Sequence, residues 1–225
     1  MLAREINENT SKFIRSSEST IYFDDDVVYK IFHNWIDIKG RSEIIKMMKD
    51  NNPKFVPLIY DYIYDNGNIV GYVMKNYRKA LSISRKKDLN LLKDLCSQLI
   101  YDYMYLRDNY GLCYFDYHEK NVLVNDNSIL LLDIDSCLPD KAQNRKISSS
   151  YLCDYILSLI YNTSFFDWEI YYRPEERLLI RNILYQNLDG SKILSLSDLL
   201  ILLENIRKKD VRMVLRKVNC KIKKF

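Results

Sequence analysis

Glycine is scarce in this chain, with five among 225 residues, and the five are scattered. Dinucleotide-binding G-x-G-x-x-G turns and P-loops both need clustered glycines beside the phosphates, so the sequence excludes both motifs. The five cysteines are odd in number and form no C-x-x-C pair, and the only two histidines, His33 and His118, are far apart. The sequence therefore argues against a structural zinc site and a disulfide framework, and it favours a reducing compartment.

Long apolar runs are also missing. No segment approaches the roughly 20 apolar residues that a membrane-spanning helix needs, and residues 1–10 lack the apolar core of a signal peptide. A formal net charge of +4 is mild, so it gives no reason to expect nucleic acid as a partner. The sequence predicts a soluble cytoplasmic protein that does not bind membranes, and secretion as an effector is left open.

The first third of the chain is rich in residues typical of strands. Val28, Lys30 and Phe32 alternate with the other apolar residues of the segment 27–32, so they are expected on one face of a strand. Asn66-Gly67 is a strong signal for a hairpin turn. The strands are predicted at residues 12–14, 20–23, 27–32, 56–64 and 69–74.

Helical periodicity dominates later. A short helix is predicted at residues 42–48, and apolar residues recur at helical spacing from Leu91 to Leu106. Gly111 follows this long helix as its C-terminal cap. After a β-like stretch at residues 121–135, the chain is predicted to be helical from about Ser148. Strands first and helices later indicate an α+β architecture with one cleft.

Chemistry is concentrated between Tyr110 and Cys137, in the stretch YGLCYFDYHEKNVLVNDNSILLLDIDSC. Asp116 follows the long helix, Asn121 opens a predicted hairpin, and Asp133 ends it. A hairpin brings its entry and its exit to the same end, and oxygen ligands of this kind suit Mg²⁺. Phosphoryl transfer needs such ligands, together with a carboxylate near the attacking hydroxyl. Asp and Asn are also common turn residues, but Asp116 and Asp133 each adjoin a strongly apolar stretch.

The segment Y-F-D-Y-H-E-K-N, followed by a hairpin and D-I-D, resembles the catalytic loop and metal-binding strands of the protein-kinase-like superfamily, H-x-D-x-x-x-x-N and D-F-G. The resemblance implies that Asp116 is the catalytic base and that Asn121 and Asp133 bind the metal. His118, two places after Asp116, is similar to the D-x-H-x-x-N loop of the aminoglycoside- and choline-kinase-like branches.

The resemblance extends to both sides of this segment. Lys30 resembles the strand lysine that pairs with the α/β-phosphates, which would explain an ammonium within an apolar strand. Glu43 resembles its partner on the following helix. The chain from Met74 to Asn76 resembles the hinge that meets adenine, and Asp154 resembles the buried aspartate that braces the catalytic loop. The first three have plainer interpretations, as a surface lysine, a first-turn glutamate and an ordinary strand, whereas an aspartate within so apolar a helix otherwise lacks a partner.

The chain also departs from the family pattern. Residues 15–19 replace the glycine-rich loop, and Glu18 among them would repel phosphates. Asp135 replaces the glycine of D-F-G, as either a further ligand or a helix cap. No long activation segment and no A-P-E motif are found. The basic stretch at residues 207–224 is read as a solvated amphipathic helix, with docking of an acidic partner as the weaker reading.

The resemblance thus implies a bilobal α+β fold, with a small β-rich N-lobe (residues 1–77, five strands and one helix) and a reduced helical C-lobe (residues 78–225). It implies an ATP- and Mg²⁺-dependent kinase that phosphorylates a hydroxyl, with Ser/Thr of a protein as the expected acceptor. Two alternatives stay open. A small-molecule kinase is favoured by His118 and opposed by the short C-lobe, and a pseudokinase binding module is favoured by the missing glycine loop.

Overall fold

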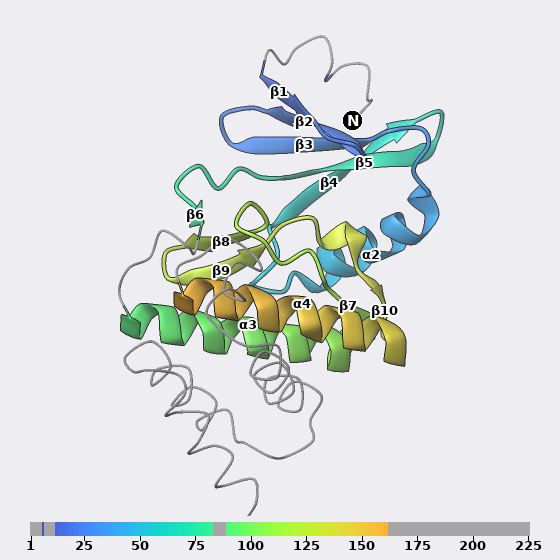
Figure 1. Cartoon of the computed structure of the whole chain (residues 1–225). Coiled ribbons are helices and arrows are strands. Elements are labelled where there is room, and N and C mark those ends of the chain that lie inside the picture. Colours follow the sequence, from blue (N-terminus) through green and yellow to red (C-terminus); the bar gives the residue numbers. More distant parts are fainter. Residues whose placement is uncertain (1–5, 7–11, 83–88, 162–225) are drawn as a thin grey trace, which may run out of the picture. The chain divides into compact units, whose positions relative to one another are not determined.

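The computed structural model of the chain describes Ile6, residues 12–82 and residues 89–161 (Figure 1). It confirms an α+β protein. Its contacts divide the chain into two compact units, the first formed by residues 1–80 with 130–137 and the second by residues 81–129 with 138–225. The first unit therefore includes a short segment from the middle of the sequence.

The first unit is built on one antiparallel sheet (Figure 1). Its strands lie in the order β1-β2-β3-β5-β4. Their bounds are Phe13–Arg15 for β1, Ser19–Phe23 for β2, Val27–Phe32 for β3, Ile59–Asp65 for β4 and Asn68–Lys75 for β5. All five predicted strands are confirmed, although β4 begins three residues later than the predicted segment.

The β4–β5 turn has the conformation that its sequence predicts. Asn66 has a φ of 46° and Gly67 a φ of 80°. A two-residue hairpin whose twist matches its strands needs positive φ at both central positions, which Asn and Gly adopt with least strain. Asp65 pairs with Asn68 across this turn. The turn thus fixes the register of β5 against β4 at this end of the hairpin.

Strand β3 separates two apolar environments. Val28, Lys30 and Phe32 are buried on one face, as the alternation predicted. On the other face Val27, Tyr29 and Ile31 pack against a small core of Ile6, Ile63 and Val73. A strand covered on both sides can hold one of its side chains away from water, and at its centre that side chain is Lys30.

Helix α2 (Ile38–Asn51) is twice as long as predicted. It begins where the Asp37 side chain accepts a hydrogen bond from the Lys39 N–H, and it ends at Asn52 in the left-handed conformation. Its first turn has Ile38 as its one apolar residue and includes Gly40, so the prediction recovered only the part that buries Ile44, Ile45 and Met48. The 3-10 turn η2 (Ile134–Ser136) packs against α2 in the same unit.

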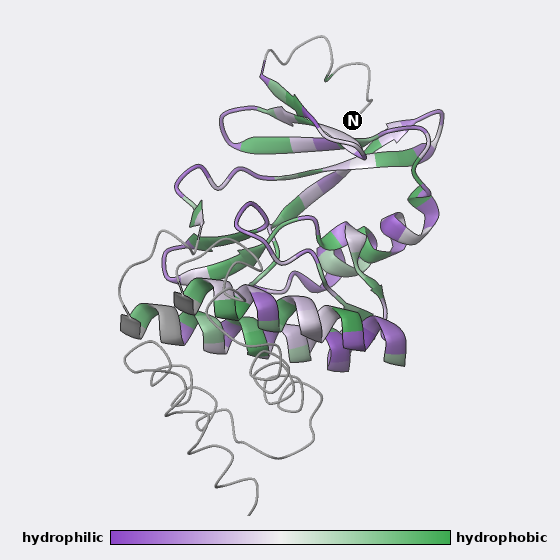
Figure 2. Ribbon diagram, in the orientation of Figure 1, coloured by the Kyte–Doolittle hydropathy of each residue, from purple (hydrophilic) through white to green (hydrophobic). Residues whose placement is uncertain are grey.

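The second unit contains two long helices, α3 (Leu89–Tyr110) and α4 (Ala142–Tyr161). Gly111, with a φ of 61°, donates its N–H to the Arg107 carbonyl and ends α3 as predicted. Figure 2 shows the N-terminal turns of α4 as hydrophilic and its later turns as mostly hydrophobic. The short strands are β6 (Leu81–Ser82), β7 (Leu112–Cys113), β8 (Val122–Asn125), β9 (Ser128–Leu131) and β10 (Leu138–Pro139).

Two small sheets are formed by these short strands. Strand β7 pairs with β10, and β8 lies between β6 and β9. The β8–β9 turn has positive φ at Asp126 and Asn127, which confirms the predicted turn. None of the helices among the described residues is long and apolar enough to cross a membrane. The basic stretch at residues 207–224 lies outside the described residues.

Candidate functional site

Lys30 is the centre of a buried ionic cluster in the first unit. Its ammonium donates one hydrogen bond of 2.8 Å to Asp133 Oδ1 and another of 2.8 Å to Asp135 Oδ1. Only 3% of its side chain is exposed. Burial by itself would lower the pKa of Lys30, but the charges of Asp135 and Asp133 outweigh it, so the pKa of Lys30 is raised above its ordinary value. Lys30 therefore stays charged inside the protein.

Asp135 is the most enclosed member of the cluster, with 0% of its side chain exposed. Besides Lys30, its Oδ1 accepts a hydrogen bond of 2.8 Å from the Tyr72 hydroxyl, and its Oδ2 accepts one of 2.9 Å from Arg41. Burial would raise the pKa of Asp135, but Lys30, Tyr72 and Arg41 outweigh it, so the pKa of this carboxyl is lowered. Asp135 is held as a buried carboxylate.

Asp133 is the open member. Its side chain is 36% exposed, and only its Oδ1 is bound to Lys30. No described residue donates a hydrogen bond to its Oδ2. Its backbone has φ 54° and ψ 33°, a left-handed conformation that costs a non-glycine residue about 1–3 kcal/mol and clusters at functional sites. The Ser136 N–H and hydroxyl both bond the Asp133 carbonyl and stabilise this conformation.

Arg41 links the cluster to the loop between β1 and β2. Its guanidinium donates to Asp135 Oδ2 and, through its other terminal nitrogen, pairs with Glu18 Oε2 at 2.9 Å. Burial would lower the pKa of Arg41, but Asp135 and Glu18 outweigh it and raise the pKa. Glu18 was predicted to repel phosphates, and in the structure its carboxylate is neutralised by this arginine. Sequence reasoning missed Arg41, because no local pattern marks it.

The expected Lys30–Glu43 pair is not formed. Glu43 is exposed, and the carboxylates that bond Lys30 are those of Asp133 and Asp135. Helix α2 turns by about 100° per residue, and its inward face is taken by Ile44, Ile45 and Met48. This orientation leaves Glu43 toward solvent, so the role predicted for Glu43 is wrong for this structure.

The predicted hinge continues strand β5. Met74 pairs with Val28 on one side and with Ile59 on the other. Asn76 donates its N–H to the Asp26 carbonyl at 2.9 Å, and its side-chain amide donates to the Asp24 carbonyl at 2.8 Å. Asn76 therefore anchors the end of β5 to the β2–β3 turn, and its N–H is already used within the chain.

Asp116 lies in the second unit, in the loop that precedes β8, and its carboxylate is oriented by two neighbours. Asn121 Nδ2 donates to Asp116 Oδ2 at 2.6 Å, and His118 Nε2 lies 3.3 Å from Asp116 Oδ1. The Lys120 N–H donates to His118 Nδ1, so a neutral His118 carries its proton on Nε2, facing Asp116. Asp116 remains 43% exposed. The loop thus presents a positioned carboxylate to solvent.

Packing below this loop fixes its backbone. The Tyr114 hydroxyl donates to the Asp116 carbonyl at 3.1 Å, and the Ser148 hydroxyl of α4 donates to the Tyr114 carbonyl. Tyr114 and Tyr117 are buried with their rings edge to face at 4.8 Å. The helix therefore supports the loop through Ser148. Asp154, which was predicted to brace the loop, is buried on the same helix.

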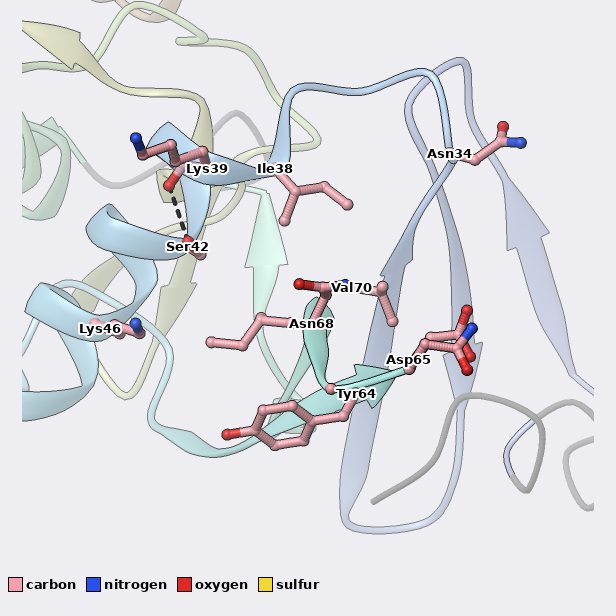
Figure 3. A pocket seen from close by; sticks show the side chains of 12 residues that line it. Asn34, Ile38, Lys39, Ser42, Lys46, Tyr64, Asp65, Asn68 and Val70 are labelled. Atoms are coloured by element: carbon pink, nitrogen blue, oxygen red, sulfur yellow. Dashed lines mark hydrogen bonds between the residues drawn. The ribbon is translucent and has the colours of Figure 1, made fainter.

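An open pocket lies elsewhere in the first unit, between the start of α2 and the β4–β5 hairpin (Figure 3). Its volume is 840 Å³, and Ile38, Lys39, Ser42 and Lys46 line it on the helix side. The Ser42 hydroxyl donates to the Lys39 carbonyl at its edge. None of the predicted site residues lines this pocket. Paired buried charges are the stronger sign of a functional site, so the candidate site is placed at Lys30 and its partners.

Each unit presents one oxygen of the kind that a hard cation binds. Within the described ranges no group of three or more His, Cys, Asp or Glu side chains is arranged to hold a metal. Mg²⁺ commonly takes one or two protein oxygens and completes its shell with phosphate and water. Asp133 Oδ2 in the first unit accepts no hydrogen bond from a described residue. The same is true of Asn121 Oδ1 in the second unit.

None of the models of known protein families matches the chain, and no curated protein matches it significantly.

Proposed function

We propose that the chain is an ATP- and Mg²⁺-dependent phosphotransferase with a bilobal protein-kinase-like fold, its N-lobe at residues 1–77 and its C-lobe at residues 78–225. The observation that carries the proposal is the 2.8 Å pair of Lys30 and Asp133, residues 103 positions apart. By the family resemblance both residues bind the triphosphate of ATP, Lys30 directly and Asp133 through Mg²⁺. Two residues that bind the same triphosphate must lie close together, and Lys30 and Asp133 do.

Asp116 would act on the acceptor hydroxyl. The hydroxyl oxygen attacks the γ-phosphorus, the bond from that phosphorus to the β–γ bridging oxygen breaks, and ADP leaves. The hydroxyl proton passes to Asp116, whose carboxylate Asn121 and His118 hold in one orientation. Asp116 keeps enough exposure to meet a large acceptor, which favours a Ser or Thr side chain of a protein.

Lys30, Asn121 and Asp133 would bind the nucleotide. Bound Mg²⁺ would neutralise charge on the β- and γ-phosphates. Asn121 Nδ2 is engaged by Asp116, which orients the amide so that Oδ1 is left for the metal. Asp133 Oδ1 is engaged by Lys30 and leaves Oδ2 for the same purpose. Each ligand is thus held by a second residue, as functional sites require.

Two other functions each have one supporting observation. The contact between His118 and Asp116 favours a small-molecule kinase of the aminoglycoside or choline type. The loop between β1 and β2 favours a nucleotide-free binding module, because it holds Glu18 and no glycine at the place where the family's loop contacts phosphates. We rank both below the protein kinase.

Transfer of labelled phosphate from ATP, with Mg²⁺, tests the proposal. The wild type is expected to phosphorylate itself or a protein acceptor, and Asp116→Asn should reduce the rate by roughly 10²–10⁴-fold, because a positioned base contributes that much. Glu119→Gln is the matched control, since Glu119 is an exposed carboxylate in the same loop. It should leave the rate unchanged.

The acceptor panel separates the three functions. Transfer to protein alone supports the protein kinase, and transfer only to an aminoglycoside or an amino alcohol supports the small-molecule kinase. A wild type that neither binds ATP nor transfers phosphate supports the binding module and contradicts the proposal.

A further inference from the structure

Asp135 is bound by protein donors at both of its oxygens. Oδ1 accepts from Lys30 and from Tyr72, and Oδ2 accepts from Arg41, all at 2.8–2.9 Å. These donors come from three different elements, β3, β5 and α2. Lys30 and Tyr72 face each other as a cross-strand pair, so their side chains leave the sheet on the same side toward Asp135.

This geometry excludes the two roles that the sequence left open for Asp135. A metal ligand needs an accessible oxygen, and Asp135 has 0% of its side chain exposed and both oxygens engaged. A helix cap needs its side chain to accept from the backbone of the following turn, and the residue at the cap position of η2 is Asp133, which makes no such bond. Among the described residues, the donors to Asp135 are all side chains.

Asp135 also stands in the place that Glu43 was expected to take. Lys30 has two carboxylate partners, and of these Asp133 is 36% exposed while Asp135 is fully buried. A buried carboxylate with three donors has one orientation, whereas the exposed one retains a free oxygen for a ligand. Of the two aspartates of D-I-D, Asp135 therefore holds Lys30, and Asp133 presents an oxygen to the ligand.

We propose that Asp135 is the positioning residue for Lys30 and that Arg41 and Tyr72 hold Asp135 in place for that task; the functional part of this inference rests on the phosphotransferase proposed above. Lys30 and Arg41 carry two positive charges, and Asp133 and Asp135 carry two negative ones. Glu18, which is more exposed, pairs with Arg41 from outside the cluster. Removing Asp135 leaves the two cations with only the exposed carboxylates of Asp133 and Glu18, which strongly destabilises such sites. Removing Lys30 as well relieves part of that cost.

Paired substitutions test the pairing without any assay of activity. Lys30→Met, Asp135→Asn and the double variant are unfolded in urea. Each single variant lowers the equilibrium ratio of folded to unfolded protein by some factor. Because contacting residues couple, the double variant is expected to have a ratio at least roughly tenfold higher than the two factors multiplied together would give. Lys30→Met with Glu43→Gln forms the second cycle, and its effects are expected to multiply to within about twofold.

The outcomes are distinct. Coupling in the Asp135 cycle and none in the Glu43 cycle supports the inference, and the reverse overturns it. Should Asp135→Asn not fold alone, Lys30→Met is expected to restore folding. Failure of the double variant to fold would show that Asp135 is needed for reasons other than Lys30, which also overturns it.

Binding of MgATP separates positioning from general support. With Lys30 present, Asp135→Asn is expected to weaken binding roughly tenfold, and in the Lys30→Met background it should change binding by less than about twofold. Equal weakening in both backgrounds contradicts a role through Lys30. A wild type that binds no MgATP contradicts the proposed phosphotransferase, while the unfolding cycles still decide whether Asp135 holds Lys30.

Discussion

Replacement of Gly71 by alanine should push strands β3 and β5 apart beside the ionic cluster. Gly71 pairs with Ile31 across β3 and with Ile63 across β4, so it lies inside the sheet. A Cβ at this position would lie 2.1 Å from the Lys30 carbonyl oxygen and 3.0 Å from Ile31 Cα. The first distance is 0.9 Å inside the 3.0 Å limit that real Cβ atoms keep, and the obstacle is backbone, so the strands themselves must move.

The expected loss is about 2–3 kcal/mol, at the upper end of overpacking in a well-packed interior. For a chain of this size it corresponds to roughly 5–10 °C in Tm. Urea unfolding followed by circular dichroism measures it, with an unchanged denaturant slope showing that only stability has changed. Because the clash falls on the Lys30 carbonyl, Gly71→Ala should also weaken nucleotide binding.

Gly40→Ala is the matched control. Gly40 lies in the first turn of α2, and an added Cβ there meets nothing within 4 Å. Alanine is the better helix former, by up to about 1 kcal/mol, so this variant should be as stable as the wild type or slightly more stable. If Gly71→Ala unfolds at the same urea concentration as Gly40→Ala, the close approach of β3 and β5 is refuted.

Two further predictions follow from buried titratable groups. Asp102 on α3 is buried, its Oδ2 has no hydrogen-bond partner among the described residues, and burial raises its pKa to about 7. A carboxyl whose pKa is raised in the folded state contributes stability at low pH, and this contribution is lost as the pH rises from about 4 to 7. In Asp102→Asn the free energy of unfolding should therefore decrease less over this pH range than in the wild type. At pH 8 the variant should be more stable by at most about 4 kcal/mol; a parallel pH profile in urea unfolding would contradict the assignment. Burial and the hydrogen bond to Asp140 raise the pKa of the Cys113 thiol to about 12. In the native protein at pH 8, iodoacetamide should therefore not alkylate Cys113. In the urea-unfolded chain Cys113 should react fully, and mass spectrometry measures both. Fast alkylation of native Cys113 would refute its burial.

Local chemistry made much of the fold predictable. The alternation in residues 27–32, the Asn66-Gly67 turn and the Gly111 cap each depend on neighbours in sequence, and all three are confirmed. The start of α2 was missed because its first turn contains a single apolar residue, Ile38, and is set by the Asp37 cap. Apolar periodicity reveals only those turns of a helix that bury a face, and the first turn of α2 contains no buried residue.

The candidate site was predictable only where residue type and local spacing define it. Asp116, His118 and Asn121 lie within six positions, and the structure brings them together. The partners of Lys30 are more than 100 positions away in the sequence. Which carboxylate reaches Lys30 depends on how α2 is rotated and where η2 packs, and neither leaves a local signature. The same reason explains why Glu43 was expected at Lys30 and why Arg41 was not.

Magnesium-dependent binding of ATP tests the central claim most directly. Isothermal titration calorimetry should show that the wild type binds ATP more tightly with Mg²⁺ than with EDTA, and that Asp133→Asn loses this difference. Asp126→Asn is the matched control, because Asp126 is an exposed aspartate of the same hairpin with a similar positive φ, and it should bind as the wild type does. A wild type that binds no ATP, or an Asp133→Asn variant with the full magnesium effect, would contradict the account.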